Sequence, residues 1–275
     1  MNPSKSVADL KGLSSAETGL RTARIGQALE KAIDEGALIL HYQPQIDLVT
    51  QALVGMEALC RWHMPSLGII PPDEFIPVAE ETGLIVPIGH GVLKQVQVDM
   101  PALLAKYPDL RVGINFSMRE LAEPDFFPFI QTWLKAMPAD YAQHFDIEVT
   151  ETAFKDVPQQ VVDGLNALRE QGLRVAIDDF GAGHSGLARL HTLPFDVIKL
   201  DKQFVQSLDH PMVRHIIQSV VQFTQIFDKG LIAEGVETEA QRDTLHSLGC
   251  RIVQGYLYSA PQPLAHWLSD SARVR

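Results

Sequence analysis

Short runs of apolar and β-branched residues alternate with longer segments of helical period along most of this chain, and this alternation restricts the fold more than any other feature. The expected strands are Leu38–Tyr42, Leu53–Leu59, Arg111–Asn115, Phe145–Thr150, Arg174–Asp178, Val197–Asp201, Leu231–Glu234 and Arg251–Gln254. The expected helices are Asp73–Thr82, Val92–Lys106, Phe127–Ala136, Val157–Gln171, Met212–Phe227 and Glu239–Leu248. Eight strands that alternate with helices in roughly 250 residues predict an α/β fold, a TIM-like (β/α)8 barrel.

The first two runs depart from this alternation. The dipeptide Gln43-Pro44 leads to residues 45–48 and then to Leu53, which leaves no room for a helix between them. Two strands joined by so short a connection form a hairpin, whereas parallel neighbours need a crossover of a dozen or more residues. We therefore expect one strand of the barrel to run antiparallel to the others.

The composition is that of a folded, acidic protein. The chain has 275 residues, of which 46% are hydrophobic and 21% charged, and its formal net charge is −11. A domain that binds nucleic-acid polymers concentrates positive charge in order to displace counterions, so the acidic balance argues against such a partner. A small anionic ligand is compatible with this charge if a metal ion bridges it to the protein.

The two cysteines, Cys60 and Cys250, provide neither a disulfide framework nor a zinc cluster, which indicates a reducing, cytoplasmic compartment. The richest apolar run, residues 84–93, is short and contains Pro87, so we expect no membrane insertion of this segment. Residues 1–24 are polar and typical of a leader or a linker from an upstream domain, while 25–275 are expected to form one domain. An upstream sensor or membrane domain is left open.

Polar side chains stand within or just after nearly every expected strand. They are Glu57, Asn115, Glu148 with Glu151, Asp178 with Asp179, Lys199 with Asp201, Glu234, and Gln254. In (β/α)8 barrels the active site forms at the C-terminal mouth from residues on several strands, so we expect these groups to converge. Carboxylates crowded in this way would repel one another and have raised pKa values unless cations lay among them. The pattern therefore predicts bound metal.

The residue types indicate which metal and which chemistry. Carboxylates and an Asn amide suit hard ions such as Mg²⁺ or Mn²⁺, and the adjacent pair Asp178-Asp179 allows one carboxylate to bridge two ions. Two such ions stabilise the attacking and the leaving oxygen in a displacement at phosphorus. Lys199 is expected either to orient and deprotonate the attacking water or to neutralise phosphoryl charge. Arg61 follows Glu57 with period two, on the same face, where it can grip a phosphate oxygen. These residues predict a metal-dependent phosphoester hydrolase.

Several motifs resemble one known family. The chain contains Glu57-x-Leu59-x-Arg61 and Asp178-Asp179-Phe180-Gly181. The further matching motifs are Tyr42-Gln43-Pro44, Asn115-Phe116-Ser117, Glu148-Val149-Thr150-Glu151, the run from Leu193 to Asp201, the run from Ala233 to Thr238, and Gln254-Gly255-Tyr256. In order and spacing they resemble the EAL domain family of cyclic di-GMP phosphodiesterases, over residues 25 to 265.

The resemblance implies a TIM-like barrel with one antiparallel strand, two Mg²⁺ or Mn²⁺ ions, and hydrolysis of cyclic di-GMP to linear pGpG. It assigns the metal ligands as Glu57, Asn115, Glu148, Asp178, Asp179 and Glu234. It implies that Lys199 contacts the nucleophilic water, with Glu57 and Glu234 also in the catalytic set. The implied substrate contacts are Gln43, Leu59, Arg61 and Gln254. Glu151 matches a residue that anchors the loop after Asp179, Asp201 and Glu237 match supporting acids, and a homodimer is expected.

Two alternatives are left open. One is a catalytically inactive receptor that binds cyclic di-GMP without cutting it, and the other is a barrel that serves only as a dimerisation scaffold. The complete set of metal-ligand positions favours the enzyme. The departures from the family pattern are Glu120 and, in the loop after Asp179, Ala182, His184 and Gly186. We expect this loop to form a flexible lid.

Overall fold

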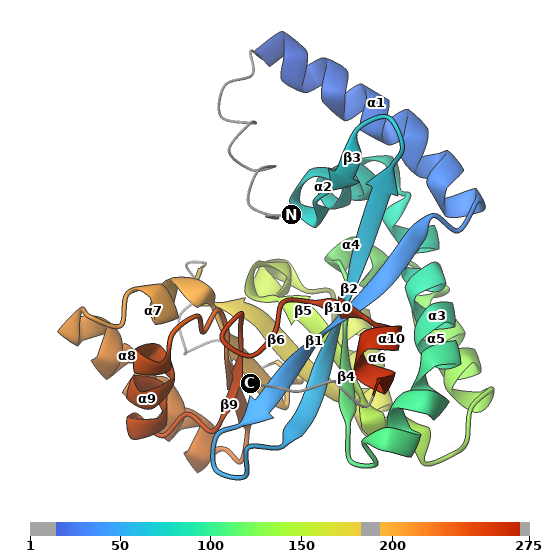
Figure 1. The fold of residues 1–275 in the computed structure, drawn as a ribbon. Helices are drawn as coiled ribbons and strands as arrows, with labels where there is room; N and C mark the ends of the chain where they lie inside the picture. Colours follow the sequence, from blue (N-terminus) through green and yellow to red (C-terminus); the bar gives the residue numbers. More distant parts are fainter. Residues whose placement is uncertain (1–14, 183–192, 270–275) are drawn as a thin grey trace. The chain divides into compact units, whose positions relative to one another are not determined.

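The computed structural model describes residues 15–182 and 193–269, which form two compact units. Of the described residues, the larger unit comprises His41–Leu59 and those from Gln95 to Ser269, and the smaller unit comprises Ser15–Leu40 together with Cys60–Lys94 (Figure 1). His184 and Gly186, for which sequence analysis predicts a lid, lie outside the described residues.

The larger unit contains a closed barrel of eight strands among the described residues. Their order around the barrel is β1-β9-β8-β7-β6-β5-β4-β2, and β1 pairs with β2 to close it. The strands are β1 (Leu38–Asp47), β2 (Leu53–Met64), β4 (Arg111–Asn115), β5 (Phe145–Thr150), β6 (Arg174–Phe180), β7 (Val197–Leu200), β8 (Gly230–Ala233) and β9 (Ile252–Gln254). The predicted TIM-like α/β barrel is confirmed.

The antiparallel strand is β1. It pairs antiparallel with β9, whereas β2, β4, β5, β6, β7, β8 and β9 form parallel neighbours. The Tyr42 hydroxyl of β1 donates a 2.6 Å hydrogen bond to Asp99, and Trp267 Nε1 donates to the Tyr42 carbonyl at 3.0 Å. These buried contacts hold the one strand that runs against the others.

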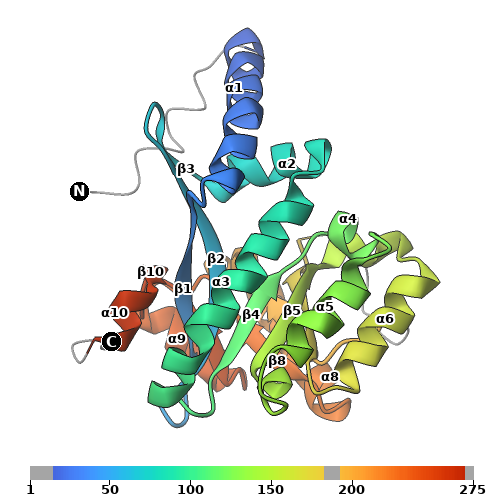
Figure 2. The same cartoon turned by 90° about the vertical axis from the view of Figure 1, so that its right-hand side faces the viewer.

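Helices lie around the strands of this unit (Figure 2). They comprise the C-terminal part of α3 (Ile85–Lys106), α4 (Met118–Leu121), α5 (Phe126–Lys135), η3 (Tyr141–His144), η4 (Glu151–Asp156), α6 (Gln159–Arg169), α7 (Lys202–Gln206), α8 (Pro211–Ile226), α9 (Glu239–Ser247) and α10 (Leu264–Leu268). The six predicted helices, which include α2 of the smaller unit, are all present. Five agree with their predicted bounds within two residues, whereas α3 begins at Ile85, seven residues before its predicted start at Val92. The short ones were not predicted, since four to six residues carry too little periodicity.

Two short strands lie outside the barrel. β10 (Gln262–Pro263) pairs with β1, and β3 (Gly68–Ile70), in the smaller unit, pairs antiparallel with the end of β2. Both are too short to show an alternating pattern in the sequence.

Opposite charges connect the starts of three neighbouring strands. Asp146 near the start of β5 is buried, and it accepts hydrogen bonds from Arg111 Nε of β4 at 2.7 Å and from Arg174 of β6 at 2.9 and 2.5 Å. A buried carboxylate requires this kind of pairing. Charge at the N-terminal ends of the strands thus stabilises the barrel at the end opposite the predicted site.

The smaller unit has its own apolar core. It contains α1 (Ser15–Asp34), α2 (Pro72–Thr82), β3, and the N-terminal part of α3. Its buried core residues are Ile25, Leu29, Ala32, Trp62, Met64, Ile70, Phe75, Val78, Ala79, Ile85 and Ile88. An ion pair of 2.6 Å between Arg21 and Glu74 also joins α1 to α2.

Helix α1 runs through the expected boundary between residues 24 and 25. Its apolar residues Ile25, Leu29 and Ala32 recur at helical spacing and are buried, whereas its preceding residues are polar in sequence. The segment expected to be a leader or linker, residues 1–24, therefore includes the polar first part of this helix. Among the described residues, none of the helices combines the length and the apolar character needed to cross a bilayer.

Candidate active site

Four carboxylates from four strands converge on one buried ammonium. Strand register places Glu57 of β2 beside Gly113, Asn115 beside Glu148, and Thr150 beside Asp178, while Glu234 directly follows β8. All four residues of β7 are buried, so the Lys199 side chain is 0% exposed. Lys199 Nζ lies 2.6 Å from Glu148 Oε2, 2.9 Å from Glu234 Oε1, 3.2 Å from Asp178 Oδ1 and 3.3 Å from Glu57 Oε2.

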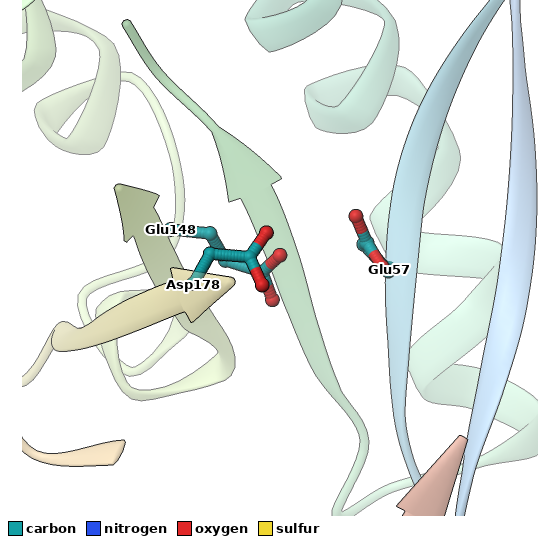
Figure 3. A group of neighbouring side chains, drawn as sticks. All are labelled: Glu57, Glu148 and Asp178. Carbon is teal, nitrogen blue, oxygen red and sulfur yellow. The ribbon is translucent and has the colours of Figure 1, made fainter. Parts of the chain in front are cut away.

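The acids form two overlapping groups. Carboxylate oxygens of Glu57, Glu148 and Asp178 lie within 4.8 Å of one another, and so do those of Asp178, Asp179 and Glu234. Figure 3 shows Glu148 and Asp178 side by side, directed toward the strand that carries Glu57. Asp178 belongs to both groups, which is the arrangement required of a bridging ligand. Asp179 has a φ of 52°, a conformation that L residues rarely adopt, and its backbone N–H donates to Asp178 Oδ1 at 2.9 Å.

Side-chain amides hold Glu57 from two sides. Asn115 Nδ2 donates to Glu57 Oε1 at 2.7 Å, and Gln254 Nε2 donates to Glu57 Oε2 at 2.5 Å. Gln254 Nε2 also donates to Gln43 Oε1 at 3.2 Å, and Gln43 Nε2 donates to the Ser259 carbonyl at 3.3 Å. The structure therefore brings predicted metal-side and substrate-side residues into one hydrogen-bonded set.

The acids of this site differ in the direction of their pKa shifts. Burial alone would raise the pKa of Glu57, but the Lys199 ammonium and the donors Gln254 and Asn115 hold it below its ordinary value. Burial raises the pKa of Glu148 well above its usual range, against the opposing effect of Lys199. Burial likewise raises the pKa of Asp178. Glu57 is thus the carboxylate most strongly held in its ionised form.

Three further groups titrate abnormally. Burial, with Asp178 and Asp201 nearby, raises the pKa of Asp179 to about 6. Burial, with Asp178 and Glu57 nearby, raises the pKa of Glu234 to about 8. Burial would lower the pKa of Lys199, but its acidic neighbours raise it well above the usual value. The ammonium form of Lys199 is therefore favoured.

The donor set fits a hard divalent cation. Carboxylate oxygens outnumber the single ammonium, and every predicted ligand is an oxygen donor. Glu234 Oε1 is buried, and the Lys199 ammonium lies 2.9 Å from it. A cation that bound Glu234 would therefore share this carboxylate with Lys199. The cluster is able to hold metal.

Three other predicted residues lie in the segments that follow β5, β7 and β8. Glu151 is buried, and its Oε2 accepts a 2.7 Å hydrogen bond from Gly181 N in the loop after β6. Asp201 is buried and caps α7, accepting from Gln203 N at 2.8 Å. Glu237 is exposed, and its backbone N–H donates to Gln241 Oε1.

The two remaining predicted residues follow Glu57 on β2. Leu59 is half-buried. Arg61 belongs to the smaller unit, where its Nη1 donates to the Cys60 carbonyl at 2.8 Å. The role of Arg61 toward a phosphate stays a prediction.

Gln45 and two glycines contact this site and are not among the residues predicted from the sequence. Gln45 Nε2 donates to Gln254 Oε1 at 3.0 Å. A Cβ added at Gly113 would overlap Glu148 Oε1, and one added at Gly55 would overlap Gln45 Oε1. The available signal for Gln45 was its period-two spacing from Gln43, which places both on one face of β1. The glycines showed no such signal, because their role is to leave space.

Gly113→Ala should weaken divalent-metal binding, because the added methyl group displaces the Glu148 carboxylate. We expect Mn²⁺ affinity, measured by isothermal titration calorimetry, to fall by about tenfold or more. The matched control is Gly91→Ala, whose Cβ meets nothing within 4 Å. Equal affinity for wild type and Gly113→Ala would contradict the assignment of Glu148 to a metal site.

Stabilisation by Mg²⁺ should increase as the pH rises from about 6 to about 8. In the ion-free protein, protonated Asp179 and Glu234 favour folding, and this contribution is lost as the pH rises through about 6 and about 8, respectively. A cation competes with the same protons, so it binds more tightly at higher pH. The difference in Tm between Mg²⁺ and EDTA samples should therefore widen across this range. A constant or narrowing difference would contradict the raised pKa values.

Comparison with known proteins assigns the family. A family model described as the EAL domain matches residues 26–261. The bifunctional diguanylate cyclase/cyclic di-GMP phosphodiesterase MucR of Pseudomonas aeruginosa is 36% identical over 247 residues, which cover 89% of this chain and 36% of MucR. The cyclic di-GMP phosphodiesterase PdeR of Escherichia coli is 35% identical over 236 residues, which cover 86% of this chain and 35% of PdeR. The chain thus spans about a third of the length of these relatives.

Solved structures agree with this assignment. A structure described as the PaMucR phosphodiesterase in a c-di-GMP complex has a TM-score of 0.82 and 34% sequence identity, over 89% of this chain and 99% of that chain. The range matched by the family model includes all eight strands of the barrel and every acid of the cluster. This chain belongs to the EAL domain family.

Proposed function

We propose that this chain is the catalytic domain of a metal-dependent phosphodiesterase that hydrolyses cyclic di-GMP to linear pGpG. The observation that carries the proposal is the cluster of four carboxylates within 3.3 Å of the buried Lys199 ammonium. The choice of substrate is supported by the relatives MucR and PdeR, which are described as cyclic di-GMP phosphodiesterases, and by the c-di-GMP complex of PaMucR.

The proposed cofactors are two Mg²⁺ or Mn²⁺ ions. The first would be held by Glu57, Asn115, Glu148 and Asp178, and the second by Asp178, Asp179 and Glu234. Two such ions supply Lewis acidity at the phosphate and lower the pKa of an attacking water. The overlap of the two acidic groups at Asp178 supports a pair of ions over a single one.

Lys199, Glu234 and Glu57 would carry the charges that act during the reaction. Because acidic neighbours hold Lys199 in its ammonium form, we favour charge neutralisation at a phosphoryl oxygen over proton abstraction as its role. Glu234 belongs to the same proposed catalytic set, and its carboxylate, 2.9 Å from Lys199 Nζ, would be ionised once cations bind, because they compete with its proton. Glu57, the carboxylate most strongly held ionised, would serve as the fixed anionic ligand.

Substrate recognition is assigned to residues beside the acids. Gln43, Leu59, Arg61 and Gln254 are the proposed substrate contacts. The Arg61 guanidinium would form a charge-assisted contact with a phosphate oxygen. This contact would offset the repulsion between the phosphate and the net negative charge of the chain. Glu151 would anchor the loop after Asp179 through its bond to Gly181 N, with Asp201 and Glu237 in supporting roles.

The assembly and context are also proposals. We propose a homodimer that acts in the cytoplasm, with residues 25–275 as the phosphodiesterase domain and residues 1–24 as a leader or a linker from an upstream domain. The partial coverage of MucR and PdeR supports a larger parent protein.

Asp178→Asn and Lys199→Ala should each reduce conversion of cyclic di-GMP to pGpG by about a hundredfold to a thousandfold, measured by chromatography in Mg²⁺ or Mn²⁺. Asp178→Asn removes the shared anionic ligand, and Lys199→Ala removes the only cation at the centre of the described cluster. The matched control is Asp243→Asn, an exposed acid on α9. EDTA should abolish turnover of the wild type.

The receptor alternative predicts a different result. Folded wild-type protein would then bind cyclic di-GMP in calorimetry yet release no pGpG after either ion is restored. That outcome would overturn the proposed enzyme and favour a binding module.

A further inference from the structure

Three glutamines form a directed chain of hydrogen bonds inside the barrel. Gln43 and Gln45 are two residues apart on β1, so their side chains lie on the same face. Gln45 pairs directly with Gln254 across the antiparallel β1–β9 ladder. All three are buried, with 8%, 4% and 4% of Gln43, Gln45 and Gln254 exposed. Buried amides at this depth depend on one another for hydrogen bonds.

The hydrogen bonds that link the three glutamines can run in only one donor-to-acceptor direction. The Ser259 carbonyl can only accept, so Gln43 presents Nε2 to it and keeps Oε1 toward Gln254. Gln254 Nε2 donates to Gln43 Oε1 and to Glu57 Oε2, and Gln254 Oε1 accepts from Gln45 Nε2 at 3.0 Å. Reversing the Gln254 amide would place its oxygen against the Glu57 carboxylate and its NH2 group against that of Gln45.

We propose that Gln45 is a positioning residue for the metal site, which fixes the Gln254 amide so that its NH2 group holds Glu57. Gln45 is the donor that occupies Gln254 Oε1. Without it, that buried oxygen loses its partner, and the two orientations of the Gln254 amide become closer in free energy. Glu57 would then lose one of its two amide donors for part of the time. This inference rests on the proposed function only for its effect on turnover.

The Gln45 amide lies close to the backbone of the neighbouring strand β2. A Cβ at Gly55 of β2 would overlap Gln45 Oε1, so the glycine leaves room for this amide. Gly55 lies two residues before Glu57, on the same face of β2. A variant at Gly55 therefore disturbs the Gln45 amide while leaving all three glutamines in the sequence.

The experiment compares Gln45→Met, Gln45→Glu and Gly55→Ala with wild type in the full chain. Met has nearly the same length as Gln but cannot donate, and Glu places an acceptor against Gln254 Oε1. We expect Mn²⁺ affinity by calorimetry to fall about tenfold for Gln45→Met and further for Gln45→Glu, with Gly55→Ala changed in the same direction. The kcat for cyclic di-GMP should fall in the same order.

The matched control is Ile46→Val, which removes a buried methylene group from the same strand. It should lower Tm without changing Mn²⁺ affinity, which separates positioning from loss of stability. Folded Gln45→Met or Gly55→Ala protein with wild-type Mn²⁺ affinity would overturn the inference. If wild type binds Mn²⁺ but does not cleave cyclic di-GMP, the proposed function fails, while the Mn²⁺ affinities still decide the role of Gln45.

Discussion

The site depends on a single buried ammonium placed among more carboxylates than it can neutralise. Lys199 lies in a strand whose residues are all buried, and four carboxylates approach its Nζ within 3.3 Å. Carboxylate oxygens within each acidic group lie no more than 4.8 Å apart. At that separation and an effective dielectric constant of about 20, two ionised carboxylates repel by on the order of 3 kcal/mol. Protonation relieves this repulsion at low pH, and bound divalent cations would relieve it near neutrality.

The parallel barrel makes this crowding possible. Its strands end at one mouth, so residues far apart in the sequence, such as Glu57 and Glu234, reach the same ammonium. The ion pairs of Asp146 with Arg111 and Arg174 stabilise the strand starts at the other end. Stability and chemistry are thus supplied by opposite ends of the same strands.

The barrel and the acids at its strand ends could be predicted from the sequence. The barrel was predicted correctly because the hydrophobic periods of strands and helices differ. Its antiparallel strand was predicted correctly because the connection after residues 45–48 is too short to contain a helix. The acids at the strand ends were found because a carboxylate next to a buried strand is costly and therefore informative. Helix α1 was missed because its first turns are polar and its apolar face begins only at Ile25.

The contacts that orient the site were not predictable in the same way. Whether Gln254 faces Glu57 depends on Gln45 across a strand pair more than 200 residues apart in sequence. Gly113 matters because of the atoms it lacks, and only the packed structure shows that Glu148 fills that space. The preferred protonation of Lys199 also follows from distances, because the sequence alone left both an acid–base and an electrostatic role open.

The account is tested most directly by anomalous X-ray diffraction from crystals soaked in Mn²⁺. It predicts two anomalous peaks in the barrel mouth, one within bonding distance of Glu57 and Glu148, the other near Asp179 and Glu234, with Asp178 touching both. A structure at saturating Mn²⁺ with no peak among these acids, and with Lys199 still their only cation, would contradict it.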